Sequence, residues 1–286
     1  MKSPFTIAFT KILLACLPAF CLFLVSCKES GSSKETYLIG HRGYGASTYH
    51  NNKSYPENSR EAIEAGLKHF DGIEIDIQAS ADGTLWIYHD SFLPGSSSCI
   101  PSSTDEQINA INNSLKKNEK IERLQDLIPL FAENHNKFIS LDIKVWFEKS
   151  CVPNNTMAMP YYLEIADSIC HLFDSPVFDK RLLIEAPYFA ILQRIEERKP
   201  LFKTFFLSFG VLDKQLDVLL KKNVDGISIG YDKGQITAPK IEALHSKNKL
   251  IQVWTINKKE SFEMLRNLNP DFIQTDNREL MALIKT

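Results

Sequence analysis

The sequence predicts an α/β fold, a (β/α)8 TIM barrel, on two observations. From residue 36 onward, eight short β-rich runs alternate with amphipathic helical runs over about 250 residues, which is the order and length of such a barrel. The composition, 44% apolar and 24% charged, is that of a packed globular protein and excludes disordered and fibrous classes. A doubly wound open sheet is the alternative, but no Gly-x-Gly-x-x-Gly follows the first predicted strand.

Each predicted barrel strand is a short run of mainly apolar or β-branched residues. In chain order the runs are residues 37–42, 72–78, 138–145, 181–186, 203–209, 226–230, 250–257 and 271–275. Between them, apolar residues recur at helical spacing in three clear sets: Ile63, Gly66, Leu67 and Phe70; Leu124, Leu127, Ile128 and Phe131; Leu212, Leu216, Leu219 and Leu220. Asn58 followed by Glu61 predicts a capping box that opens the first helix.

A stretch after the second barrel strand interrupts the repeat. The turn Ala81-Asp82-Gly83 leads into residues 85–90, which predict one extra short strand. Residues 91–122 are polar, rich in Ser and Asn, and show no clean period. Such a stretch in a compact barrel is usually a functional loop or a small insertion, so we expect residues 91–122 to lie over the active face.

The N-terminus has the composition of an export signal. A short basic start is followed by residues 12–25, which are almost wholly apolar and too few for a comfortable membrane-spanning helix. Leu24-Val25-Ser26-Cys27 resembles a bacterial lipobox, so Cys27 is the predicted site of lipidation. The expected organisation is a lipoprotein signal peptide over residues 1–26, a polar tether over 27–35 and the barrel domain over 36–286, with the insertion at 91–122.

Localisation and charge follow from that signal. The whole chain has 33 Lys and Arg against 35 Asp and Glu, and two of the lysines lie in the signal, so the mature chain would carry a net charge of −4. We expect an exported bacterial lipoprotein held at the membrane, on the periplasmic face or at the cell surface. An uncleaved membrane anchor is the alternative. The sequence has no basic stripe, so no nucleic-acid partner is expected.

Three cysteines remain for the barrel domain. They are Cys99, Cys151 and Cys170, an odd number that allows at most one intramolecular disulfide plus a free thiol. Their spacing matches no zinc pattern, so they are expected to pack or to form one surface staple.

Acidic residues lie on strands that should be apolar on both faces. In residues 72–78 every second residue is isoleucine, and Glu74 and Asp76 lie between them; Asp142 and Lys144 alternate with apolar residues in the next barrel strand. Carboxylates about 7 Å apart on a buried face repel unless a cation or base lies between them. Glu74, Asp76 and Asp142 therefore predict a hard oxygen site for Ca²⁺ or Mg²⁺. A solvated acidic face on an edge strand is the alternative.

Two histidines end predicted strands, where barrel enzymes place their chemistry. His41 ends the first barrel strand, beside Arg42, and His89 ends the extra strand. Two histidines, a cation site and a guanidinium suit phosphoryl transfer, because they supply a base, an acid, charge neutralisation and a phosphate clamp. A single histidine at a strand end is more often a packing residue, so the hypothesis depends on the combination.

The order of these motifs resembles one family. The motifs are Gly40-His41-Arg42-Gly43, Pro56-Glu57-Asn58-Ser59, Asp71-Gly72-Ile73-Glu74-Ile75-Asp76-Ile77-Gln78, Asp82-Gly83, His89-Asp90, Asp142-Ile143-Lys144, Trp254-Thr255-Ile256-Asn257 and Thr275-Asp276. Together they span about residues 37–286 and resemble the glycerophosphodiester phosphodiesterases. The resemblance implies a TIM barrel, a divalent metal and hydrolysis of deacylated phospholipids to an alcohol and glycerol 3-phosphate.

Roles carry over from the resemblance to matching positions. It implies that the acid–base pair is His41 and His89, that the phosphate ligands are Arg42 and Lys144, and that the metal ligands are Glu74, Asp76 and Asp142. Glu57 would be a metal ligand or an orienting group, or else an acid beside a helix N-terminus. Trp254 would form an apolar wall for the glycerol or head group, or else pack in the core.

Two features depart from the family pattern. The segment between Gly43 and Pro56 is longer than usual, and Asp142 stands where the family usually has glutamate. The related sphingomyelinase D-type phospholipases are similar at that position and would act on intact lipids by internal attack of a hydroxyl. A non-catalytic lipoprotein that binds phosphoglycolipid is a further alternative.

Overall fold

The computed structural model describes residues 35–48, 55–145, 151, 158–232 and 235–284. They belong to one compact unit, Lys34–Thr286. The predicted signal peptide, Cys27 and all of the tether but Glu35 lie outside the described residues. Within the described residues, no helix is long and apolar enough to cross a membrane.

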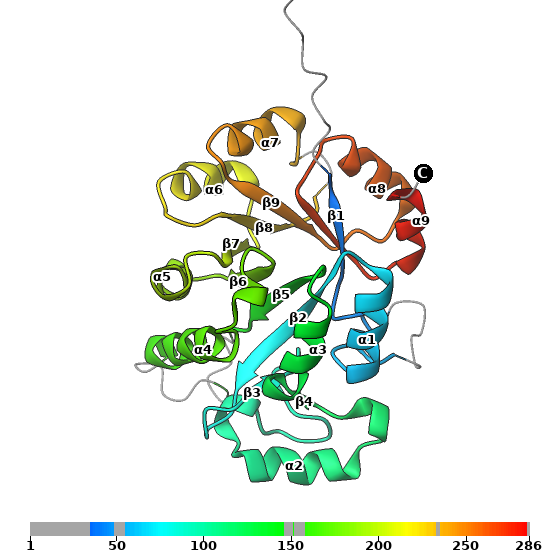
Figure 1. The fold of residues 1–286 in the computed structure, drawn as a ribbon, viewed down its shortest axis with the longest axis vertical. Coiled ribbons are helices and arrows are strands. Elements are labelled where there is room, and N and C mark those ends of the chain that lie inside the picture. Colours follow the sequence, from blue (N-terminus) through cyan, green and yellow to red (C-terminus); the bar gives the residue numbers. More distant parts are fainter. Residues whose placement is uncertain (1–34, 49–54, 146–150, 152–157, 233–234, 285–286) are drawn as a thin grey trace, which may run out of the picture. The chain divides into compact units, whose positions relative to one another are not determined.

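Eight parallel strands form a closed barrel, which confirms the predicted fold class (Figure 1). The barrel strands in chain order are β1 (Tyr37–Gly40), β2 (Gly72–Ala79), β5 (Phe138–Ile143), β6 (Leu182–Ala186), β7 (Lys203–Ser208), β8 (Gly226–Gly230), β9 (Leu250–Trp254) and β10 (Phe272–Thr275). Each strand pairs with the next around the ring, and β1 pairs with both β10 and β2, which closes it. The open-sheet alternative is therefore wrong.

The extra strand predicted after β2 is present and shorter than expected. It is β3 (Leu85–Ile87), antiparallel to β2, and it pairs in turn with β4 (Glu122–Arg123), which the sequence did not predict. Both strands lie outside the ring, at the carboxyl end of β2.

Helices follow the barrel strands and, except for α2, which belongs to the lobe after β3, cover the outside of the ring (Figure 1). They are α1 (Arg60–His69), α2 (Asp105–Ser114), α3 (Ile128–Glu133), α4 (Ala158–Leu172), α5 (Phe189–Arg198), α6 (Leu212–Leu219), α7 (Ala238–His245), α8 (Lys259–Arg266) and α9 (Met281–Ile284). The apolar face predicted over residues 124–131 begins in a short 3₁₀ turn, Leu124–Leu127, and continues into α3. In the third set, Leu220 lies beyond the end of α6 and is exposed.

The predicted cap of the first helix is wrong by one residue. Ser59 is the N-cap of α1, and its hydroxyl accepts a hydrogen bond from the backbone N–H of Ala62. Asn58 has a φ of 61°, so its side chain turns away from the helix and toward the barrel, where its amide donates to Asp76. The spacing to Glu61 pointed to Asn58, but Ser caps helices as well as Asn does, and here the cap is the residue that follows.

The inside of the barrel has an apolar floor. Ile39, Leu183, Phe205 and Phe272 form a buried cluster there, with the Phe205 and Phe272 rings 5.8 Å apart. Because side chains alternate along β2, its isoleucines pack outward against the helices, whereas Glu74 and Asp76 point inward. All eight residues of β2 are buried, so the alternative of a solvated acidic face is wrong.

The predicted insertion forms a small lobe with its own core. Residues 91–122 contain α2 and two 3₁₀ turns, Ile100–Ser102 and Lys117–Glu119, although no helical period was evident in the sequence. Trp86, Leu93, Ile100, Ile108 and Ile121 form the lobe's buried cluster. A disulfide joins Cys99 to Cys151, and Cys170 is a buried free thiol, as the odd cysteine count allows.

Candidate active site

The predicted site residues gather at the carboxyl ends of the barrel strands. His41 and Arg42 follow β1, Lys144 follows β5, and Trp254 ends β9. The chain can turn sharply after β1 because Gly43 adopts a φ of 87°, and a Cβ at Gly43 would lie 2.9 Å from the backbone of Ala62. Barrel enzymes place their chemistry at this end of the strands.

Three buried carboxylates form the centre of the site. Ligand atoms of Glu74, Asp76 and Asp142 all lie within 4.8 Å of one another. Asp76 and Asp142 are register partners on the neighbouring strands β2 and β5. Oε1 of Glu74 and Oδ1 of Asp142 are buried and accept no hydrogen bond from any described residue. Such oxygens are costly to bury unless a cation binds them.

Two basic side chains reach this cluster. The Lys144 ammonium nitrogen lies 2.6 Å from Oδ1 of Asp76 and 2.6 Å from Oδ2 of Asp142. The Arg42 Nε lies 3.7 Å from Oδ2 of Asp76, and the backbone N–H of Arg42 donates to Glu74 over 2.9 Å. The carboxylates are therefore held together by positive charge from two different strands.

Burial and charge act in opposite directions on these groups. Burial raises the pKa of Glu74 well above its usual range, and the neighbouring Asp76 raises it further. Burial also raises the pKa of Asp142. Burial alone would raise the pKa of Asp76, but the charge of Lys144, followed by that of His89, outweighs it and holds the pKa below its usual range. Asp76 is thus the most firmly ionised member of the cluster.

The donor set fits a hard divalent cation. Ca²⁺ and Mg²⁺ prefer carboxylate oxygens, and three such groups from two strands converge here with two oxygens that have no other partner. Glu74, Asp76 and Asp142 could hold such an ion. A second group that could take part in metal binding, Glu57, His89 and Asp90, lies nearer the surface.

His41 is oriented by a carboxylate. Its Nδ1 lies 2.7 Å from Oδ1 of Asp276, and its Nε2 lies 3.9 Å from Oε2 of Glu74. Asp276 also accepts hydrogen bonds from the backbone N–H of Ala46 and the amide of Asn257. With Nδ1–H donated to Asp276, Nε2 of His41 faces the carboxylate cluster.

Asp276 follows β10, and the sequence assigned it no role. Burial alone would raise its pKa, but the hydrogen bond from His41 and the other donors outweigh burial and lower it. A signal for Asp276 was present in the sequence, because Thr275-Asp276 lies at the end of a predicted barrel strand. His41 was selected on the same kind of position.

His89 lies after β3, on the outer side of the cluster. Its Nδ1 is 2.8 Å from Oδ1 of Asp90, and its side chain is 29% exposed. Gln78 donates from its side-chain amide to the backbone carbonyls of Tyr88 and Asp90, which fixes the loop that carries His89. The structure thus brings both predicted histidines to one site, with His41 deeper and His89 nearer solvent.

Glu57 and its neighbour Asn58 belong to the site. Glu57 accepts a 2.6 Å hydrogen bond from Nη1 of Arg42 and a 2.7 Å bond from the backbone N–H of Ser47. It lies before the N-cap of α1, so it is not an acid of the helix's first turn. The Asn58 amide donates to Oδ2 of Asp76 over 2.6 Å, and the sequence assigned it only a capping role.

A fourth buried carboxylate, Glu185, lies inside the barrel and was missed. It is the register partner of Asp142 on β6 and accepts hydrogen bonds from Ser140, Ser228 and Gln274. Burial, followed by the charge of Asp142, raises the pKa of Glu185 to about 6. The signal was available, because an acid in the middle of an apolar barrel strand is the same anomaly that drew attention to Glu74.

Trp254 lines a cavity on the opposite side of the barrel mouth from His89. The cavity is about 300 Å³, and the Trp254 ring meets the Phe209 ring edge-on at 5.8 Å.

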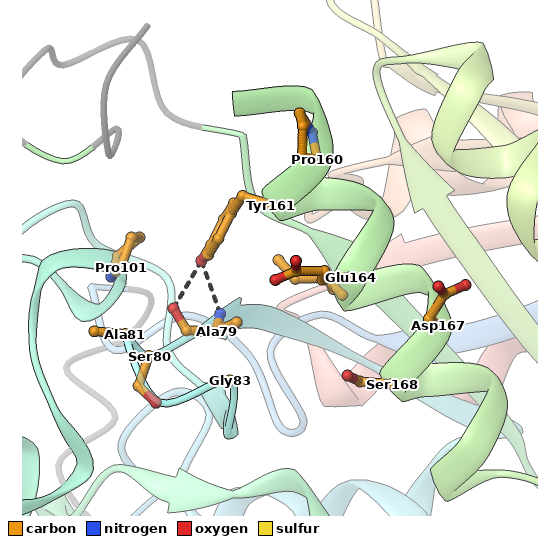
Figure 2. A pocket seen from close by; sticks show the side chains of 11 residues that line it. Ala79, Ser80, Ala81, Gly83, Pro101, Pro160, Tyr161, Glu164, Asp167 and Ser168 are labelled. Atoms are coloured by element: carbon orange, nitrogen blue, oxygen red, sulfur yellow. Dashed lines mark hydrogen bonds between the residues drawn. The ribbon is translucent and has the colours of Figure 1, made fainter. Parts of the chain in front are cut away.

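A larger cavity of about 570 Å³ lies apart from the predicted residues (Figure 2). It is bounded by the hairpin after β2 and by α4, where Tyr161 hydrogen-bonds both backbone groups of Ala79. Asp167, at one end, already pairs with Arg194 and Arg198. None of the predicted catalytic, phosphate or metal residues lines it.

Fold and site together define a (β/α)8-barrel enzyme with an acidic centre that could hold a cation and with a carboxylate-oriented histidine. The sequence profile of the glycerophosphoryl diester phosphodiesterase family matches residues 41–280. The chain therefore belongs to the glycerophosphoryl diester phosphodiesterase family.

Curated relatives carry the same name. A glycerophosphodiester phosphodiesterase of Bacillus altitudinis is 23% identical over 251 residues, which cover 84% of this chain and 94% of that protein. A glycerophosphodiester phosphodiesterase of Caldanaerobacter subterraneus is 24% identical over 256 residues, which cover 86% of this chain and 96% of that protein.

Solved structures share the fold. A glycerophosphodiester phosphodiesterase from Parabacteroides distasonis superposes with a TM-score of 0.71 at 20% identity and covers 88% of this chain and 97% of that one. An Oleispira antarctica phosphodiesterase, solved in complex with the product sn-glycerol-3-phosphate, superposes with a TM-score of 0.67 at 16% identity; 88% of this chain and 98% of that one are covered.

Proposed function

We propose that this enzyme is a divalent-metal-dependent phosphodiesterase that cleaves glycerophosphodiesters to an alcohol and glycerol 3-phosphate. The observation that carries the proposal is the His41–Asp276 pair facing the buried cluster of Glu74, Asp76 and Asp142. Family membership and the product named for the Oleispira structure support the same substrate class.

The proposed first step is attack by the substrate's own hydroxyl. Nε2 of His41 accepts the proton of the glycerol 2-hydroxyl, and that oxygen forms a bond to phosphorus. His89 donates a proton to the oxygen of the departing alcohol as its bond to phosphorus breaks. Asp276 stabilises the imidazolium that forms on His41, because its carboxylate accepts the Nδ1–H.

The second step returns both histidines to their starting states. His89 takes a proton from water, the water oxygen attacks the cyclic phosphate, and His41 returns its proton to the 2-oxygen as that bond breaks. The charges of Arg42 and Lys144 oppose the negative charge on the phosphate oxygens. Ca²⁺ or Mg²⁺ held by Glu74, Asp76 and Asp142 would neutralise further phosphate charge and orient those oxygens.

The experiment is a substrate panel with metal replacement. The full chain, purified in detergent and stripped with a chelator, would be given single divalent ions and several glycerophosphodiesters. We expect alcohol and glycerol 3-phosphate in equal amounts, only when metal is restored. Absence of turnover across all diesters and ions would reject the proposal in favour of a binding lipoprotein, and turnover of sphingomyelin alone would favour the sphingomyelinase D-type activity.

We further propose that Cys27 is lipidated and anchors the enzyme outside the cytoplasm. The Cys99–Cys151 disulfide supports export, because structural disulfides persist mainly in oxidising compartments. Metabolic labelling with a tagged fatty acid should mark the wild type and leave Cys27→Ala unmarked, with the variant recovered in the soluble fraction. Labelling of Cys27→Ala at the wild-type level would reject the anchor.

A further inference from the structure

The end of the barrel opposite the active site carries a basic patch that the chemistry above does not use. It lies on the loops that precede β7, β8 and β9, at the amino ends of these strands. The patch consists of four lysines and two exposed leucines: Lys221, Lys222, Lys247, Lys249, Leu201 and Leu220. We propose that this basic patch docks on the anionic phospholipid surface of the membrane that holds Cys27, so that the active site faces away from that membrane. The proposal rests on the lipid anchor of the proposed function and not on the proposed reaction.

The lysines of the basic patch keep their charge at the surface. Lys221 and Lys247 are exposed, and their ammonium groups form no hydrogen bond or ion pair with any described residue. The Lys249 ammonium donates to two backbone carbonyls, and the Lys222 ammonium lies 5.4 Å from the centre of the Phe189 ring. None of these contacts supplies a carboxylate that would neutralise the lysine.

Few acids lie among these lysines. The three loops of the patch, all of whose residues the structure describes, hold one acid, Asp225, whose carboxylate lies 2.8 Å from Nζ of Lys203. Glu196, on α5, also lies near this end and accepts a hydrogen bond from Asn223. The patch therefore has an excess of positive charge, whereas the mature chain as a whole is acidic.

Two apolar side chains lie exposed beside the lysines. Leu201 is 46% exposed and Leu220 is 37% exposed. Leu220 directly precedes Lys221, and Leu201 lies on the neighbouring loop, because β7 and β8 pair. Surfaces that lie on a membrane combine apolar side chains, which enter the headgroup region, with lysines that attract anionic lipid.

The polypeptide enters the barrel at this same end. The backbone N–H of Tyr37, which begins β1, donates to the carbonyl of Asp271 just before β10, and β10 pairs with β9, which follows the loop that bears Lys247. Cys27 precedes Glu35 by eight residues, which span at most about 28 Å whatever their conformation. A lipid on Cys27 would thus hold this end near the bilayer, where a weak attraction between charges is enough to orient the domain.

Docking at this end decides which molecules reach the active site. The strands have their amino ends at the patch and their carboxyl ends at the opposite mouth, where His41 and the carboxylate cluster lie. With the patch on the membrane, the mouth opens toward water. Substrates would then arrive as water-soluble diesters rather than as lipids of the same bilayer.

The test measures the reactivity of single lysines on vesicles. The mature lipidated protein is inserted into vesicles of neutral phosphatidylcholine, with or without phosphatidylglycerol, and is acetylated briefly and at low yield. Mass spectrometry then gives the labelling rate of each lysine. We expect Lys221 and Lys247 to react roughly 3- to 10-fold more slowly on the anionic vesicles than on the neutral ones. Salt at about 0.5 M should remove the difference, because it screens exposed charges.

Two exposed lysines outside the patch are the matched controls. They are Lys258, which precedes α8 on the side of the mouth, and Lys117, which lies on the lobe. Both should react at the same rate on the two kinds of vesicle. Equal rates for Lys221 and Lys247 as well would overturn the docking surface, and slower labelling of Lys258 in their place would overturn it by showing that the mouth faces the membrane.

Charge removal assigns the orientation to the patch. When Lys221→Gln is combined with Lys247→Gln, Lys222 should react equally on both vesicles, whereas it should stay protected on the anionic ones when Lys117→Gln is combined with Lys258→Gln. Both double variants should hydrolyse soluble diesters at the wild-type rate, because neither changes a residue of the site. Protection of Lys222 that survives the loss of Lys221 and Lys247 would reject the patch.

Docking and chemistry fail separately in this design, because lysine labelling does not depend on turnover. Absence of diester hydrolysis with Lys221 and Lys247 protected would reject the proposed reaction and support the patch. If Cys27 carries no lipid, the anchor fails, and the full chain is floated with the same vesicles instead. Binding to phosphatidylglycerol that the substitutions of Lys221 and Lys247 abolish supports the patch, and binding that survives them, or no binding, rejects it.

Discussion

Asp276 fixes the imidazole of His41, with Oδ1 lying 2.7 Å from Nδ1. The same oxygen accepts the backbone N–H of Ala46, and Asn257 binds the other oxygen. The carboxylate is therefore held from three sides, and the ring it orients presents Nε2 toward the acidic cluster. The first predictions test this arrangement.

His41→Ala and His89→Ala should each reduce turnover by about 10²- to 10⁴-fold, the usual effect of removing an acid–base group. Both variants should unfold at about the wild-type temperature, because both side chains lie at the barrel mouth. His135→Ala, an exposed histidine far along the chain from either, is the control and should be fully active. Equal activity in all three variants would remove the histidines from the mechanism.

Asp276→Asn should lower kcat by roughly 10- to 100-fold with little change in KM, as is typical when an orienting partner is lost. Asparagine keeps the size of the side chain but cannot offer the charge that stabilises protonated His41. Steady-state kinetics on glycerophosphodiesters, with thermal unfolding to confirm the fold, measures the effect. A variant with raised KM and unchanged kcat would show that Asp276 acts in substrate binding instead.

Asp142→Asn should weaken metal affinity more than it affects stability. In the chelated protein, removing this charge relieves repulsion with Asp76 and Glu74, whereas bound metal loses a ligand. The measurement is the metal concentration needed for half-maximal activity, together with the rise in unfolding temperature on adding metal. Asp142→Glu, which restores the family's usual residue, is the comparison and should retain metal binding. If Asp142→Asn needs no more metal than the wild type, Asp142 is not a ligand.

Glu185 should make stability depend on pH. Its pKa is raised to about 6 in the folded protein from an ordinary value of 4.5, so the folded state holds the proton more tightly. Its contribution to stability is therefore greatest below pH 4.5 and is lost as pH rises through about 6, by about 2 kcal/mol in total. Urea unfolding of the chelated wild type and of Glu185→Gln between pH 5 and 8 should show the wild type losing more stability. Parallel pH profiles would contradict the assignment.

Cys99→Ser or Cys151→Ser should destabilise the domain by about 4 kcal/mol, because the disulfide closes a 52-residue separation in the unfolded chain. Unfolding in denaturant measures the loss. Cys170→Ala, which removes the buried free thiol and keeps the disulfide, is the control. Its stability should still fall when reductant is added, and should become insensitive to reductant only when Cys99 and Cys151 are replaced as well. Wild-type protein whose stability does not change on reduction would show that the disulfide contributes nothing.

The barrel could be predicted because strand periodicity reports burial directly. The alternation in residues 72–78 put the isoleucines on one face and the acids on the other, and in the structure the isoleucines face outward and the acids inward. Strand ends were less accurate: the predicted strand 250–257 ends at Trp254, and the predicted 85–90 ends at Ile87. Ends depend on hydrogen bonds to neighbouring strands, which no local pattern encodes.

The site was predicted only where an anomaly was visible within one strand. Glu74 and Asp76 were found because two acids recur on one face. Asn58, Asp276 and Glu185 were missed because their importance lies in partners 18 to 235 positions away along the chain. The α2 helix was missed for a related reason, since its packing partners come from the lobe rather than from the barrel.

The apolar cluster beneath the carboxylates closes one end of the barrel and leaves the other end open. Ile39, Leu183, Phe205 and Phe272 seal the lower end, so ligands and water reach Glu74 and Asp142 only from the carboxyl-terminal mouth. The alcohol and the attacking water must therefore pass through the same opening one after the other. The alcohol has to leave before the water that opens the cyclic phosphate can take its place. An alcohol that dissociates slowly would delay that water, so slow release of the alcohol would show as accumulation of the cyclic intermediate.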